Sequence, residues 1–167
     1  PEPEGPPVDP LLGEAYEPWR EGQVTPDSPY WELEVMYHKA QHKECAELAE
    51  KKFKETGDAH YTLYIARAWY QYLEGNEQIT DKKERTEIYE RALAKLDEGI
   101  AKDPDDVHLK FAWGVLMGRI GTTRGVLASL RTADDIENAW LEVLDSDYKY
   151  ASISLQEELP CDGYLAM

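Results

Sequence analysis

The sequence predicts an all-α domain built from stacked antiparallel helical hairpins. Apolar residues recur at steps of three and four up to Ile100, so one face of a helix there is apolar and needs a neighbour. Asp103-Pro104-Asp105-Asp106 stops this helix, because proline lacks an amide hydrogen and disfavours helical geometry in the preceding residue. A second apolar helix follows at once from Val107, which completes a hairpin. The apolar positions of the first helix are Ile88, Ala92, Leu93, Leu96, Gly99 and Ile100.

Length and charge limit the classes of function. The chain has 167 residues, enough for one domain with a sizeable core, and a formal net charge of −16. Such a charge repels nucleic acid and anionic lipid headgroups, so we expect no nucleic-acid partner. The acidity serves either solubility or the steering of a partner with a basic surface.

The N-terminal segment 1–28 is expected to be a Pro-rich tether followed by a short helix or clip. It opens with PEPEGPPVDP, the kind of tether that follows a removed signal peptide or lipid anchor. We therefore expect a secreted protein, with any lipid anchor upstream. No apolar run approaches the roughly 20 residues that span a bilayer, so we expect no membrane insertion. The two cysteines, Cys45 and Cys161, are too few for a disulfide framework and leave a single bridge open.

Helices are predicted through the first half of the range 29–160, which we assign to the helical domain. Ser28-Pro29 is a helix start, and the pattern to Gly57 is read as two helices that separate near residues 41–43. A broad aromatic stripe follows Asp58 and requires a helix that is nearly surrounded by others. After a loop at residues 74–80, Asp81 with Glu84 resembles a capping arrangement for the long helix that ends before Asp103.

The second half is predicted to hold four further helices. The run from Val107 to Met117 is apolar almost all round and is placed at the centre of the domain. The run GRIGTTRG, from Gly118 to Gly125, is expected to break the helix, and a short extra helix should follow to Ala133. The next helices carry Ile136 to Leu144 and Tyr150 to Leu159, with residues 161–167 as a loose tail.

The helical units repeat. Ala92, Leu96, Gly99 and Ile100 match Ile136, Trp140, Val143 and Leu144 in spacing. The pattern resembles a tetratricopeptide repeat, with glycine at Gly99 where alanine is usual. The offset between the two sets exceeds the usual period of about 34 residues by about ten. We place these insertions in expanded loops inside each unit, at residues 75–82 and 121–133, within a right-handed superhelix.

The expanded pattern is similar to the T component of tripartite ATP-independent periplasmic (TRAP) transporters. The residues that carry the resemblance run from KLDEGIAKDPDDVHLKFAWG to LEVLDSDYKYA. The resemblance implies a periplasmic helical scaffold that assembles with itself and docks a substrate-binding protein. The chain departs from this family because it ends shortly after Leu159-Pro160, where further repeats are expected.

One group consists of residue types that coordinate metal ions. His38, His42 and Cys45 follow one another at steps of four and three, which puts two imidazoles and a thiol on one helical face. The same face continues into Ala49 and Phe53, so we interpret it as a packing stripe and keep a three-ligand metal site as the alternative.

No cofactor is expected from the other motifs. Gly118, Gly121 and Gly125 lack the strand and the Lys-Ser or Lys-Thr pair of a phosphate loop, and no Cys-x-x-Cys-His run is present for haem. The carboxylate pairs lie among other surface charges, so they indicate capping or solvation and not acid catalysis.

Aromatic and arginine side chains supply the candidates for partner binding. Tyrosine contributes 11 residues, and a groove lined by Tyr, Trp and Arg is what a peptide-binding or oligomer-forming repeat presents. Some of these side chains could instead pack against the N-terminal clip. The candidates are Tyr30, Trp31, Tyr37, Arg67, Tyr70 and Arg124.

Together these features predict a non-catalytic scaffold or adaptor that binds a protein partner or a second copy of itself. Two alternatives stay open. One is a carrier of a small apolar ligand held between helices, and the other is a metal-dependent enzyme that uses the His38, His42 and Cys45 face.

Overall fold

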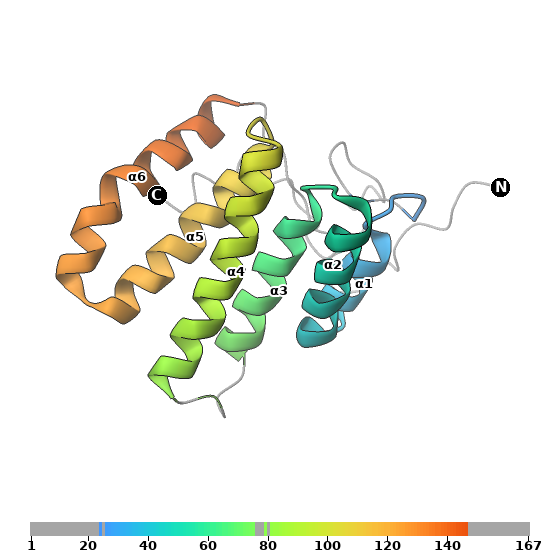
Figure 1. Cartoon of the computed structure of the whole chain (residues 1–167), viewed down its shortest axis with the longest axis horizontal. Coiled ribbons are helices and arrows are strands. Elements are labelled where there is room, and N and C mark those ends of the chain that lie inside the picture. The colour runs from blue at the N-terminus through green and yellow to red at the C-terminus, as the bar shows by residue number, and fades with distance from the viewer. Residues whose placement is uncertain (1–23, 25, 76–78, 80, 147–167) are drawn as a thin grey trace, which may run out of the picture.

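The computed structural model describes residues 24, 26–75, 79 and 81–146, and in this part of the chain it is all-helical, without strands (Figure 1). The all-α prediction is thus confirmed for these residues. None of their helices is long and apolar enough to span a lipid bilayer. The helices are α1 (Trp31–His38), α2 (His42–Thr56), α3 (Tyr61–Gly75), α4 (Lys82–Lys102), α5 (Val107–Arg124) and α6 (Val126–Asp145).

The helices pack in chain order, with α1 and α6 at opposite ends of the row (Figure 1). Each helix contacts the next one along the chain, and α3 also contacts α5 across the position of α4. Helix α3 therefore packs against α2, α4 and α5. It holds nine buried residues, which confirms that this helix is nearly surrounded; they are Tyr61, Thr62, Leu63, Tyr64, Ile65, Ala66, Ala68, Trp69 and Leu73.

Local signals place most of the helix boundaries. Asp81 accepts a hydrogen bond from the Glu84 amide at 2.8 Å, so the predicted cap of α4 is confirmed. The helices on either side of residues 103–106 are also as predicted, and Asp106 caps α5. Residues 29–57 form two helices, and the break includes Ala40 with a φ of 58°. Gly57 ends α2 in the left-handed conformation that glycine adopts without strain.

The first helix begins later than its sequence predicts. Its first residue is Trp31, and the capping residue Tyr30 makes no side-chain cap. Ser28 still organises the turn, because its hydroxyl accepts a hydrogen bond from the Tyr30 amide at 3.2 Å.

The predicted break over residues 118–125 is wrong. Helix α5 continues through Gly118 and Gly121 to Arg124, and only Gly125, with a φ of 103°, interrupts the chain. Glycine inside a helix costs about 1 kcal/mol. Burial of Ile120 and Gly121 against the neighbouring helices offsets that cost.

The short helix expected before Ala133 does not exist as a separate element. Residues 126–145 form the single helix α6, so the expanded loop predicted at residues 121–133 is also wrong. The extra residues of this unit lengthen its two helices. Of the other predicted insertion, residues 76–78 and 80 lie outside the described part of the chain.

Helix α5 is less enclosed than predicted. Leu109, Ala112 and Leu116 are buried, whereas Phe111 and Trp113 are only half-buried. The helix contacts α3, α4 and α6, but the most completely buried helix is α3. Predicted elements that lie outside the described residues are most of segment 1–28, the helix at residues 150–159, and the tail with Cys161.

Close packing explains the glycine at the repeat position where alanine is usual. A Cβ atom on Gly99 of α4 would lie 2.1 Å from Oγ1 and 3.0 Å from Cβ of Thr62 in α3. Thr62 is buried and its hydroxyl donates to the Ala59 carbonyl at 2.7 Å, so it has a fixed place. Helices α3 and α4 thus approach more closely than an alanine would allow.

We predict that Gly99→Ala lowers the free energy of unfolding by about 1–3 kcal/mol, the usual cost of overpacking a core. Urea unfolding followed by circular dichroism measures it. The matched control is Gly118→Ala, because nothing lies within 4 Å of a Cβ there. That variant should gain up to about 1 kcal/mol from helix propensity. A Gly99→Ala variant as stable as the wild type would contradict this packing.

Candidate functional site

Two Asp-x-His segments stand at the starts of α3 and α5 and form the centre of the candidate site. In Asp58-Ala59-His60 and in Asp106-Val107-His108, aspartate Oδ1 accepts a hydrogen bond from the histidine amide at 3.0 Å. Aspartate favours such local turns because its short carboxylate reaches the backbone two residues on. His60 directly precedes α3, and His108 lies in the first turn of α5.

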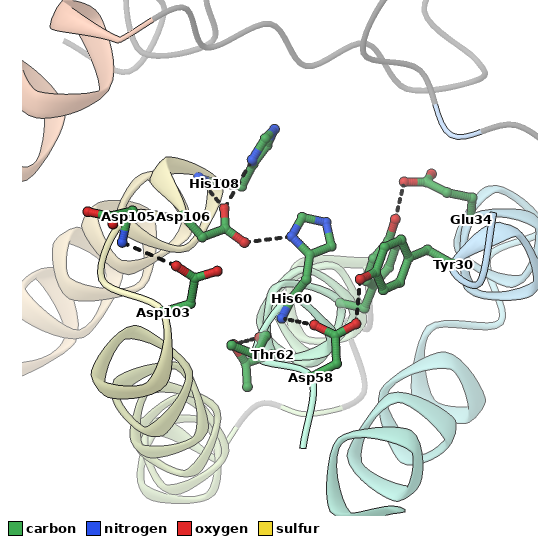
Figure 2. A network of polar contacts seen from close by, with 11 residues as sticks. Tyr30, Glu34, Asp58, His60, Thr62, Asp103, Asp105, Asp106 and His108 are labelled. Atoms are coloured by element: carbon green, nitrogen blue, oxygen red, sulfur yellow. Dashed lines mark hydrogen bonds and ion pairs between the residues drawn. The ribbon is translucent and has the colours of Figure 1, made fainter. Parts of the chain in front are cut away.

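Asp106 joins both imidazoles (Figure 2). Its Oδ2 atom lies 2.7 Å from His60 Nδ1, and its Oδ1 atom lies 3.1 Å from His108 Nδ1. Burial would raise the pKa of Asp106, but the hydrogen bonds and charges of the two imidazoles outweigh it. The pKa of this carboxyl therefore lies well below its usual range, and the ionised group ties the start of α5 to the start of α3.

Tyr30 extends the network toward α1. Its hydroxyl donates to Asp58 Oδ2 at 2.5 Å, and its ring centroid lies 4.7 Å from that of His60 (Figure 2). Burial, reinforced by the hydrogen bond to Asp58, raises the pKa of Tyr30 well above its usual value. The phenol therefore stays neutral and acts as a hydrogen-bond donor.

A buried ion pair joins α1 to the middle of α3. Glu34 is only 1% exposed, and its Oε1 atom accepts hydrogen bonds from Arg67 Nη1 at 2.9 Å and from the Tyr64 hydroxyl at 3.0 Å. Its Oε2 atom lies 3.2 Å from His38 Nε2. The Arg67 guanidinium also lies 4.3 Å from the centroid of the Tyr37 ring, as a cation–π contact. The charge of Glu34 is thus compensated within the fold.

The structure brings three of the six partner-binding candidates together. Tyr30, Tyr37 and Arg67 all belong to the contacts between α1 and α3. Trp31 is half-buried at the start of α1. Tyr70 packs against the core, 6.3 Å from the ring of Tyr89, and Arg124 pairs with Glu90 of α4 away from this group.

The residues of the predicted metal face do not share one helix. Helix α1 ends at His38 and α2 begins at His42, and the Tyr37 ring lies 5.3 Å from one imidazole and 5.2 Å from the other. Cys45 is a free, buried thiol that donates to the Leu33 carbonyl at 3.4 Å. Burial raises the pKa of Cys45 to about 12, so the free thiol stays protonated at neutral pH.

The site at Asp106 was missed because its members lie far apart in the sequence. The available signal is the repeated Asp-x-His, at residues 58–60 and 106–108, directly before two predicted apolar helices. Equivalent positions in stacked hairpins lie side by side, so the repetition predicts a cluster at the helix starts.

Comparisons of the chain with protein-family models, with curated proteins and with solved structures find no match. Function is therefore inferred from the chain's own geometry.

We predict that Glu34→Ala lowers the free energy of unfolding by about 3–5 kcal/mol, because it leaves the Arg67 charge without its buried partner. Arg67 is 15% exposed, so solvent compensates little of this loss. Thermal and urea unfolding measure the change. Glu32→Ala, an exposed position on the same helix, is the control and should stay within about 0.5 kcal/mol of the wild type. Equal effects of the two substitutions would show that the ion pair does not stabilise the fold.

Proposed function

We propose that this chain is a non-catalytic helical-repeat scaffold that binds a protein partner. The observation that carries the proposal is the contact of α3 with α5 as well as with α2 and α4. Such contacts are what result when the hairpin α3–α4 stacks on the hairpin α5–α6. Stacked hairpins expose long surfaces relative to their core, and proteins of this architecture use those surfaces for binding.

The repeat spacing supports a tetratricopeptide-like superhelix as the finer form of this proposal. Gly99 and Val143 occupy matching positions in the two units, and both are buried, Gly99 against α3 and Val143 in a cluster with Val107 and Phe111 of α5. The resemblance to the TRAP transporter T component adds a periplasmic location and self-assembly. In that setting the chain would hold other proteins in place and carry out no reaction.

The α1 end of the helix row is our proposed contact surface. Trp31 and Tyr37 are half-buried there, and aromatic side chains of this kind dominate the energy of protein interfaces. The net charge of −16 selects a partner with a basic surface and speeds its association.

We predict that the full chain, used as bait in a bacterial periplasmic extract, retains one protein in stoichiometric amount. Salt should weaken retention, because the Debye length falls from about 10 Å at 0.1 M to about 3 Å at 1 M. Trp31→Ala should weaken binding at least about tenfold, the effect of losing an interface hot spot of about 2 kcal/mol.

The control for this experiment is Leu141→Ala on α6, at the other end of the row (Figure 1). Leu141 is a 46% exposed apolar residue, so its removal tests whether any exposed apolar side chain has the same effect. Retention of lipid alone would favour an apolar-ligand carrier. Retention of the chain's own copies alone would reduce the proposal to self-assembly, and no retained protein at all would contradict it.

A further inference from the structure

We propose that His60, Asp106 and His108 form a binding site for one divalent transition-metal ion, with zinc as the representative ion. One ligand atom of each residue lies within 4.8 Å of those of the other two. Among the residues that the structure describes, this is the group of three histidine, cysteine or carboxylate side chains whose ligand atoms lie that close together. The site is independent of the scaffold function proposed above.

The ligand types select the class of metal. Two imidazole nitrogens and one carboxylate oxygen suit zinc and its neighbours, whereas magnesium and calcium require mostly oxygen ligands. Zinc ligands about 2.0–2.1 Å from the ion lie roughly 3.4 Å apart in a tetrahedral arrangement. The present distances from the Asp106 oxygens to the histidine nitrogens, 2.7 and 3.1 Å, are slightly shorter than this. The side chains would therefore have to move apart only a little to admit the ion.

The surroundings favour a cation and exclude an anion. Asp58, next to the site, adds a second carboxylate, and the chain as a whole is strongly acidic. The amides at the two helix starts, which could hold an anion, are already bound by the carboxylates of Asp58 and Asp106. An anion would therefore be repelled by these carboxylates and would find the helix-start amides already bonded.

The site is both accessible and held in place. The side chains of His60 and His108 are 22% and 28% exposed, so an ion can reach them, whereas Asp106 is only 10% exposed. The Tyr30 ring packs on His60, and the Asp58 carboxylate fixes the His60 backbone. Such supporting contacts orient metal ligands and raise affinity. Three protein ligands leave a coordination position that water fills.

Metal binding would join the start of α3 to the start of α5. A ligand that binds only the folded chain raises its stability by RT ln(1 + [L]/Kd), which is about 2.7 kcal/mol at a hundredfold excess over Kd.

The test uses the four histidines of the chain as two matched pairs. Zinc is titrated calorimetrically into the wild type, into His60→Ala/His108→Ala and into His38→Ala/His42→Ala, with thermal unfolding of each at the same zinc concentration. The wild type should bind one zinc ion and unfold at a higher temperature. The first pair of substitutions should abolish both effects, and the second should leave both unchanged.

A single His108→Asn variant keeps the result interpretable if the first double variant fails to fold. Asparagine can still donate to Asp106 but lacks the imidazole, so zinc affinity should fall at least about tenfold while circular dichroism stays the same. The proposal is overturned if the wild type binds no zinc, if His108→Asn binds it as tightly as the wild type, or if only the His38→Ala/His42→Ala pair removes binding.

Discussion

The burial of most of α3 is the constraint on which the rest of the structure depends. With α2, α4 and α5 around it, few positions on this helix can carry a polar group. Thr62, Tyr64 and Arg67 nevertheless do, and each finds a partner: the Ala59 carbonyl for the first and Glu34 for the other two. A buried polar group without such a partner would cost a large part of the stability of a domain this size.

The need of these polar groups for partners fixes the positions of the neighbouring elements. Helix α1 has only eight residues and gains its position by supplying Glu34 to α3, while the segment before α5 supplies Asp106 to His60. The same contacts that complete α3 therefore place two imidazoles and a carboxylate together at an accessible edge (Figure 2). The same side chains thus join α3 to its neighbours and form the proposed metal site.

Local chemistry made part of this fold predictable. The Asp81 cap, the stop at Asp103-Pro104 and the stripe that becomes α3 depend on residues near one another in sequence, and the structure confirms them. The continuity of α5 through Gly118 and Gly121 depends on burial by other helices, so propensity alone misplaced its end. The Asp106 cluster depends on the stacking of two hairpins, and only the repeated Asp-x-His could have indicated it. The order of helices was therefore more predictable than their lengths or the site.

The central role of α3 is most directly tested by native-state hydrogen exchange resolved by residue. If α3 is the element that the others complete, its amides exchange most slowly and only through global unfolding, so their opening free energies equal that from urea unfolding. Amides of α1 and α6, at the two ends of the helix row, should exchange through smaller local openings. Exchange of the α3 amides as fast as those of α1 or α6 would contradict this account.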